Sequence, residues 1–276
     1  MKSRVFYYCT SCGYKSSKWL GKCPECGAWN SFEEVEEKEG SVSRVPEASY
    51  TAISVVEASE SERIFSGEKE LDRVVGGFVP GQTILLAGEP GVGKSTLLLH
   101  IANILAKDYR VCYLHGEESA SQIKLRAKRL GVKGDFWLLA DTRVEVVEGF
   151  LRQKKPEVFL VDSVQMLEVG RYNSPPGSVL QVRESTQTLV RVCKELGILL
   201  ILVGHITKSG QIAGPRVVEH LVDTVLFFEQ DRKGLYRIIR SLKNRFSATD
   251  EWGIFEMTAE GIRSLSATAS LFRHAY

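Results

Sequence analysis

The sequence lacks any hydrophobic run that approaches the roughly 20 apolar residues of a membrane-spanning helix. Its first residues, 1–5, lack the apolar stretch of a secretory signal peptide. A strong excess of either charge is also missing, since the formal net charge is +2. Such a balance neither favours nor excludes nucleic acid, because binding requires only a local basic stripe. These absences predict a cytoplasmic protein without membrane contact.

The composition is that of an ordinary globular protein. The chain has 276 residues, of which 43% are hydrophobic and 25% are charged, so it can form one large domain and a small one. Its six cysteines, in a reducing compartment, suggest metal ligation or plain burial rather than disulfides. Cys112 and Cys193 lie in apolar segments and are expected to be buried.

The other four cysteines form two CxxC pairs, Cys9 with Cys12 and Cys23 with Cys26. Two such knuckles can close a tetrahedral Zn²⁺ site, and a redox dithiol pair is the alternative. A fragment this short has little core, so the metal would supply most of its folding free energy. We predict a Cys₄ zinc finger over 1–32, with Trp19 and Trp29 packed beside the knuckles; stacking of these rings on bases is the alternative.

The composition changes after the knuckles. Residues 33–40 are mostly Glu, and 41–62 are rich in Ser, Glu and Ala, which is typical of a solvated tether. We therefore predict a linker over 33–62 and a second domain over 63–276.

The second domain alternates apolar strand patterns with helix patterns. Strands are predicted at 83–87, 111–115, 136–140, 158–161 and 199–204, with helices at 94–106, 119–130, 143–154 and 179–196. This alternation is typical of an α/β fold with a mostly parallel sheet. Three further strands, at 224–228, 236–241 and 254–257, have no helices between them and suggest an added antiparallel edge.

A phosphate-binding pattern, GxxxxGK[ST], joins the first predicted strand to the first helix. Its residues are Gly88, Glu89, Pro90, Gly91, Val92, Gly93, Lys94 and Ser95, followed by Thr96. Backbone N–H groups in such a loop bind phosphate, and the helix start adds partial positive charge. Lys94 is expected to contact the β- and γ-phosphates of ATP and Ser95 to ligate Mg²⁺. A glycine-rich turn before a helix is the alternative.

Polar residues end the neighbouring strands. Asp162 follows four apolar residues and is the candidate for the magnesium shell. Glu117 or Glu118 could act as general base, while Ser119 is a plausible helix N-cap. His205 ends the most apolar strand and could sense the γ-phosphate, although a single histidine is often structural.

Taken together, these segments resemble the RadA (Sms) family of bacterial DNA-repair ATPases, relatives of the RecA recombinases and DnaB helicases. The resemblance rests on the Cys₄ motif, the phosphate loop and the segments GEES at 116–119, GHITK at 204–208, IAGPR at 212–216 and KNRFS at 243–247. It implies a RecA-like P-loop ATPase core behind a zinc finger. Two features depart from the family: Ser247 replaces its signature glycine, and the chain stops where a Lon-protease-like domain would begin.

The resemblance implies an ATP-driven motor that encircles single-stranded or branched DNA as a hexameric ring and extends branches during recombination. It implies association with the nucleoid, a RecA-type recombinase as partner, and replication or repair proteins bound through the zinc finger. Glu117 falls at the family's catalytic glutamate and His205 at a phosphate-sensing position. Lys243 and Arg245 fall where basic fingers enter the neighbouring subunit's site.

Two loops are candidate DNA contacts. One, at 170–177, contains Arg171, and the other, at 207–211, contains Lys208, with Arg216 just beyond it. Both are glycine-bearing and basic, which suits backbone phosphates, and ordinary loops are the alternative. Two other functions remain open: an ATP-gated ring scaffold that hydrolyses ATP to reset itself, and a small-molecule P-loop kinase.

Overall fold

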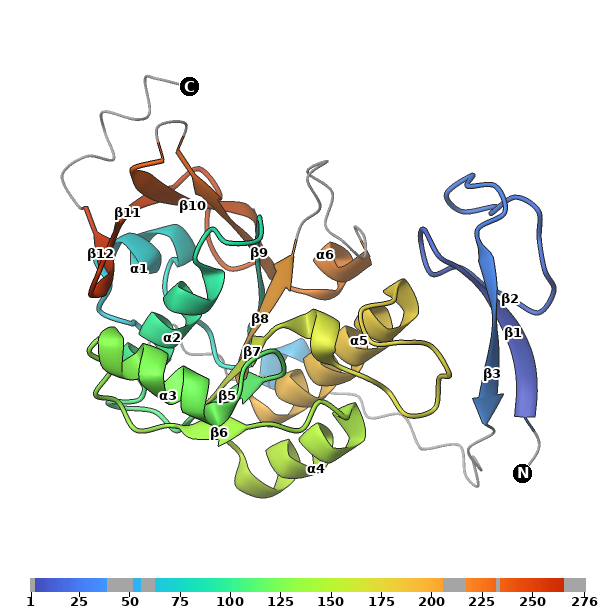
Figure 1. The fold of residues 1–276 in the computed structure, drawn as a ribbon, viewed down its shortest axis with the longest axis horizontal. Coiled ribbons are helices and arrows are strands. Elements are labelled where there is room, and N and C mark those ends of the chain that lie inside the picture. Colours follow the sequence, from blue (N-terminus) through green and yellow to red (C-terminus); the bar gives the residue numbers. More distant parts are fainter. Residues whose placement is uncertain (1–2, 39–51, 56–62, 206–216, 232–233, 266–276) are drawn as a thin grey trace.

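The computed structural model describes residues 3–38, 52–55, 63–205, 217–231 and 234–265. Its strands form a three-stranded sheet and a nine-stranded sheet, drawn to the right and left in Figure 1. Among the described residues, no helix combines the length and hydrophobicity that a membrane crossing needs.

The small sheet is built from β1 (Ser3–Cys9), β2 (Lys15–Ser16) and β3 (Phe32–Lys38). β1 pairs antiparallel with β3 over the whole length of both strands, so residues 33–38 of the predicted linker lie in this sheet. Tyr8 and Val35 are buried in the same hydrophobic cluster as Leu180 of the large domain. The small sheet therefore packs against the large domain.

The large sheet has the strand order β12-β11-β10-β9-β4-β8-β7-β5-β6. Its strands are β4 (Thr83–Gly88), β5 (Val111–His115), β6 (Trp137–Leu139), β7 (Val158–Asp162), β8 (Leu199–His205), β9 (Thr224–Gln230), β10 (Tyr236–Asn244), β11 (Trp252–Thr258) and β12 (Gly261–Ser264). The helices are α1 (Lys69–Val75), α2 (Lys94–Leu105), α3 (Ala120–Arg129), α4 (Val144–Lys154), α5 (Val179–Leu196) and α6 (Val217–Leu221), with short 3₁₀ turns η1 (Ile53–Val55) and η3 (Val164–Met166).

The predicted mostly parallel α/β sheet is confirmed. The strand predicted at 224–228 is β9, which pairs antiparallel with β10 as predicted and also runs parallel to β4 on its other side. The chain re-enters the sheet beside β4 after α6, and a crossover of this kind returns a strand in the parallel direction. The antiparallel edge consists of β10, β11 and β12.

Each face of the large sheet has its own hydrophobic core. Side chains of α4, α5 and α6 pack on one face, and those of α1, α2 and α3 pack on the other. Alternate residues of β4 point to opposite faces, with Leu85 and Ala87 in the first core and Ile84 and Leu86 in the second. Cys112 and Cys193 are buried as predicted.

Ser247, at the position of the family's signature glycine, lies against Gly76. Gly76 follows α1 with φ of 78°, and a Cβ built there would lie 2.3 Å from the Ser247 Oγ. Arg63 connects the two turns, since its Nη1 donates to the Gly76 carbonyl at 2.7 Å and its Nη2 to the Phe246 carbonyl at 3.0 Å. Because Gly76 has no side chain, the turn has room for Ser247.

This packing predicts that Gly76→Ala destabilises the large domain by about 2 kcal/mol, through left-handed backbone strain and overlap with Ser247. Adding Ser247→Gly should remove the overlap and recover about half of the loss. The free energy of unfolding in denaturant measures both effects. If the double variant were no more stable than Gly76→Ala, the proposed overlap with Ser247 would be contradicted.

Candidate active site and metal centre

The four cysteines of the two knuckles come together in the small sheet. Their Sγ atoms all lie within 4.8 Å of one another. Cys9 Sγ is 3.6 Å from Cys26 Sγ, and Cys12 Sγ is 3.5 Å from Cys23 Sγ. A tetrahedron with Zn–S bonds of about 2.3 Å has edges of about 3.8 Å, so the donor set fits Zn²⁺.

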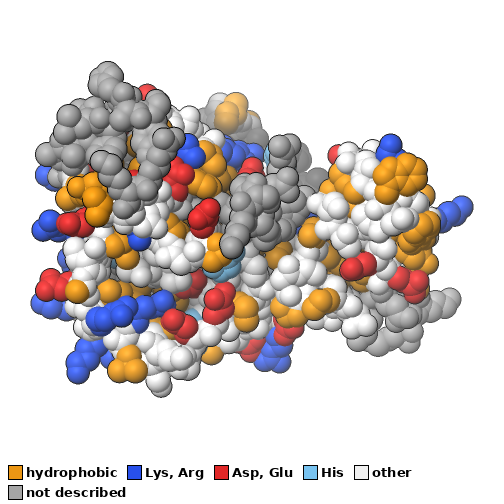
Figure 2. Space-filling model, turned by 45° about the horizontal axis from the view of Figure 1, so that its top comes forward, with side chains coloured by type: hydrophobic (Ala, Val, Ile, Leu, Met, Phe, Trp, Pro, Cys, Tyr) orange, Lys and Arg blue, Asp and Glu red, His pale blue; other side chains and the backbone are white. Residues whose placement is uncertain are grey.

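Trp19 and Trp29 do not pack as predicted. Their exposed fractions are 54% and 70%, and hydrophobic side chains are visible on the outer side of the small lobe at the right of Figure 2. The Lys22 ammonium lies 5.5 Å from the centre of the Trp29 ring. The knuckles are closed by backbone turns instead, since hydrogen bonds of 2.8 and 2.9 Å close the turns at 9–13 and 23–27.

The phosphate loop lies between a buried strand and a helix start. β4 is buried over its whole length, and α2 begins at Lys94 with Gly93 as its N-cap, at φ of 108°. A Cβ on Gly88 would lie 2.2 Å from the Phe228 carbonyl oxygen, so a side chain does not fit there. Gly91 also has a positive φ, 81°, which a glycine adopts without strain. The loop thus has the glycine-dependent turns expected of a phosphate cradle.

Lys94 is buried in this loop, with an exposed fraction of 4%. Its Nζ donates to the carbonyl oxygens of Gly88 and Glu89, each at 2.8 Å. Burial lowers the pKa of Lys94 to about 8, while the carboxylates of Asp162 and Glu117 oppose that shift. These charges fit ATP with Mg²⁺. The phosphates would pair with the buried ammonium, and Mg²⁺ would pair with the two carboxylates.

The pKa predicts that nucleotide affinity falls as the pH rises. In the free protein Lys94 loses its proton near pH 8, and bound phosphate would raise that pKa, so binding takes up a proton. Between about pH 7.5 and about pH 9 the Kd of a non-hydrolysable ATP analogue should rise about eightfold. In Lys94→Arg, whose guanidinium stays charged, the Kd should change little. An equal rise of the Kd in the starting protein and in Lys94→Arg would contradict the assignment of this pH dependence to Lys94.

Asp162 ends β7 as the sequence predicted, although the predicted strand stopped one residue earlier. Its Oδ2 accepts a hydrogen bond of 2.6 Å from the hydroxyl of Tyr113 on β5. Tyr113 is fully buried, and burial together with Asp162 raises its pKa well above the ordinary value. Sequence reasoning missed Tyr113, because it lies within an apolar strand pattern that gives no sign of a polar partner.

The two candidate glutamates have different surroundings. Glu117 Oε1 accepts a hydrogen bond of 2.8 Å from Ser163 Oγ and lies 3.4 Å from His205 Nε2. His205 pairs with Gly88 at the start of the phosphate loop, so Glu117 faces the nucleotide site. Glu118 instead forms a 2.7 Å ion pair with Arg126 of α3. The geometry favours Glu117 as the general base, and Ser163 is a further site residue that the sequence did not indicate.

The predicted N-cap of α3 is present. Ser119 Oγ accepts from the Gln122 N–H at 3.3 Å, and the Ser119 N–H donates to Gln122 Oε1 at 2.8 Å. This capping box ties the segment after β5 to the helix start. It therefore helps to hold Glu117 in place.

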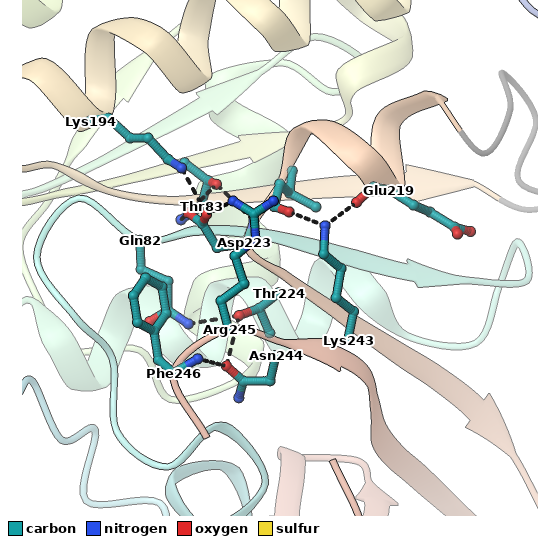
Figure 3. Close-up of polar contacts among 11 residues, drawn as sticks. Gln82, Thr83, Lys194, Glu219, Asp223, Thr224, Lys243, Asn244, Arg245 and Phe246 are labelled. Atoms are coloured by element: carbon teal, nitrogen blue, oxygen red, sulfur yellow. Dashed lines mark hydrogen bonds and ion pairs between the residues drawn. The ribbon is translucent and has the colours of Figure 1, made fainter. Parts of the chain in front are cut away.

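Lys243 and Arg245 lie at the other end of the sheet from the phosphate loop. Lys243 lies near the end of β10 and Arg245 directly follows that strand, beside residues 223 and 224 and the first residue of β4 (Figure 3). β4 is six residues long, which separates the two ends by about 17 Å. The structure therefore does not bring these cations to the nucleotide site of their own chain.

Of the predicted DNA-contacting residues, Arg171 alone lies within the described part of the chain. It is half exposed, and its Nη2 donates to Glu184 of α5 at 2.7 Å. A DNA phosphate would have to replace this carboxylate. Lys208 and Arg216 lie outside the described residues.

A parallel sheet, a glycine-rich loop before α2 and acidic residues at the ends of β5 and β7 define a P-loop ATPase domain of RecA-like fold. The N-terminal cysteines add a zinc ribbon. Comparison with known families agrees: the chain belongs to the AAA domain family, which it matches over residues 52–211, and residues 7–34 match the rubredoxin metal binding domain.

Individual relatives make the resemblance more specific. The chain is 44% identical to the DNA repair protein RadA of Halalkalibacterium halodurans and 45% identical to that of Aquifex aeolicus. Each comparison covers 98% of this chain and 62% of the relative, so the chain spans less than two thirds of their length. The predicted resemblance to the RadA family is confirmed.

A solved structure supports the fold alone. The KaiC-like protein from Pyrococcus horikoshii OT3 superposes with a TM-score of 0.60 at 20% identity. The comparison covers 74% of this chain and 98% of that protein.

Proposed function

We propose that this protein is a DNA-dependent ATPase motor that acts on recombination intermediates during DNA repair. The observation that carries this proposal is the position of Glu117, held by Ser163 and beside His205, across from the buried ammonium of Lys94. A carboxylate there can take a proton from a water that attacks the γ-phosphate. The names of the RadA relatives support DNA repair as the setting.

Different residues of this chain would have different roles at the nucleotide. The loop at 88–96 would bind the phosphates, with Lys94 against the β- and γ-phosphates. Ser95 and Asp162 would hold Mg²⁺. When bound, the ion would neutralise phosphate charge and so favour transfer of the γ-phosphoryl group to water. The Tyr113 hydroxyl orients the Asp162 carboxylate, and Ser163 orients that of Glu117. His205 would report the state of the γ-phosphate to the segment that follows it.

Lys243 and Arg245 would act on the nucleotide of a neighbouring copy. Their distance from the phosphate loop of their own chain supports a role across an interface, as in a hexameric ring. A cation supplied by a second subunit would neutralise charge that develops on the phosphates. Hydrolysis would then depend on assembly.

DNA and protein partners would bind outside this site. Arg171, Lys208 and Arg216 would contact phosphates of single-stranded or branched DNA. The exposed rings of Trp19 and Trp29 give the zinc finger at 1–32 an apolar surface for a RecA-type recombinase or for replication and repair proteins. We place the protein in the cytoplasm at the nucleoid. Because the sheet of the finger extends to Lys38, the segment that joins the finger to the ATPase domain at 63–276 would be 39–62.

The proposal is tested by the rate of ATP hydrolysis with and without single-stranded DNA, at low and moderate salt. We expect stimulation by DNA that falls as salt rises, because phosphate contacts release counterions. Arg171→Ala should reduce the stimulation and leave the DNA-free rate unchanged. Arg263→Ala is the matched control, since Arg263 is an exposed arginine that pairs with Glu256 on β11, away from the candidate loop.

Other outcomes favour the alternatives. Hydrolysis without any response to DNA would favour the ATP-gated scaffold, for which the exposed tryptophans offer a recruiting surface. Absence of phosphate release with water as the sole acceptor would favour a small-molecule kinase.

A further inference from the structure

A buried carboxylate lies beside Arg245 at the base of the sheet. Asp223 immediately precedes β9 and is 2% exposed. Its Oδ2 accepts hydrogen bonds from Thr83, at 3.1 Å from the backbone N–H and 2.8 Å from the hydroxyl. This oxygen therefore holds the carboxylate to the start of β4.

The other oxygen of Asp223 binds two cations at once. Lys194 Nζ lies 2.7 Å from Oδ1, and Arg245 Nη1 lies 3.2 Å from the same atom. The cations approach from different elements, Lys194 from the last turn of α5 and Arg245 from the segment after β10, as Figure 3 shows. Burial would raise the pKa of Asp223, but Lys194 and Thr83 hold it below its ordinary value. One buried negative charge thus has two positive partners.

Arg245 is the less firmly held of the two cations. Its side chain is 55% exposed, and its contact with Oδ1 is longer by 0.5 Å than that of Lys194. Lys243 differs again, because its Nζ donates to the backbone carbonyls of Glu219 and Val222 at 2.8 and 2.6 Å. Arg245 can therefore leave its partner by side-chain rotation, provided that the carboxylate stays neutralised.

We infer that Lys194 is a positioning residue for Arg245: it neutralises Asp223 when Arg245 turns away to bind the phosphates of a neighbouring copy. This inference rests on the proposed role of Arg245 across an interface. Removing one partner of a buried ion pair leaves an uncompensated charge, which is strongly unfavourable. With Lys194 in place, that penalty is small because the shorter ion pair remains. Without Lys194, Asp223 holds Arg245 in its own subunit.

The test compares steady-state ATP hydrolysis of the full chain carrying substitutions at these positions. Lys194→Met should lower kcat about tenfold with KM unchanged, because the nucleotide pocket itself is intact. Lys194→Arg should retain kcat, since it keeps the charge. Adding Asp223→Asn to Lys194→Met should bring kcat back to within about threefold of the starting protein, because the amide no longer holds Arg245 and still offers an oxygen to Thr83.

The control is Arg191→Met. Arg191 lies one turn earlier on α5, is exposed, and pairs with Glu148 and Glu195 instead of Asp223. We expect no change in its kcat. Thermal unfolding of each variant, with a bound ATP analogue, checks that the domain is folded and binds nucleotide.

Each result has a distinct meaning. A double variant no faster than Lys194→Met would overturn the inference and leave the cluster a purely structural one. So would an unchanged kcat in Lys194→Met while Arg245→Ala is inactive. If Arg245→Ala itself hydrolyses ATP at the normal rate, the proposed role of Arg245 fails instead.

Discussion

Replacing Lys94 by alanine is expected to lower the rate of ATP hydrolysis at least 100-fold. The buried ammonium now donates to the carbonyls of Gly88 and Glu89 at 2.8 Å, and phosphate oxygens would replace these acceptors. Loss of a charged donor that stabilises developing negative charge slows catalysis by about 10²–10³-fold. The rate of phosphate release at saturating ATP and Mg²⁺ measures the effect.

Lys69→Ala provides the comparison. Lys69 opens α1, outside the loop, so its loss should leave hydrolysis within about twofold of the starting protein. Normal hydrolysis in Lys94→Ala would show that the glycine loop is not the phosphate site, and the proposed function would fall with it.

Glu117→Gln is the second substitution with a large expected effect. The amide keeps an oxygen for the Ser163 hydroxyl but cannot accept a proton from water. General-base catalysis contributes about 10²–10⁴-fold, so kcat should fall by at least 100-fold. Binding of ATP should be retained, because the phosphate loop is unaltered. Single-turnover hydrolysis with a parallel binding measurement separates the two steps.

The neighbouring glutamate is a matched control. Glu118→Gln removes a carboxylate one residue away, but that carboxylate pairs with Arg126 and is not directed at Ser163. Its kcat should change less than about threefold. If Glu118→Gln were the slower variant, the assignment of the general base would be reversed.

Local patterns were sufficient to predict much of this molecule. The glycine loop, the strand ending at Asp162 and the CxxC pairs each place several groups by short-range spacing, and the structure brings each set together. The helix at 179–196 was predicted to the residue, because its apolar positions recur at helical spacing and Gly197 ends it in a left-handed turn.

Features that depend on distant parts of the chain were not predictable. The direction of β9 is set by its pairing with β4, about 140 positions earlier, and no pattern within 224–230 records it. The partners of Asp162, Glu117 and Arg245 were missed for the same reason. Tyr113, Ser163 and Asp223 become significant when the sheet places them beside these residues.

The position of Lys243 and Arg245 at the far end of the sheet has a further consequence for how such a protein is controlled. A chain whose phosphate loop cannot meet its own Lys243 and Arg245 carries two separate halves of an active site. Mass action then decides how often the halves of two copies come together. On the proposed mechanism, dilution alone would switch activity off without any change in the chain, and local crowding of copies on one DNA would switch it on. The specific activity, in units per milligram, would then rise with protein concentration until assembly is complete.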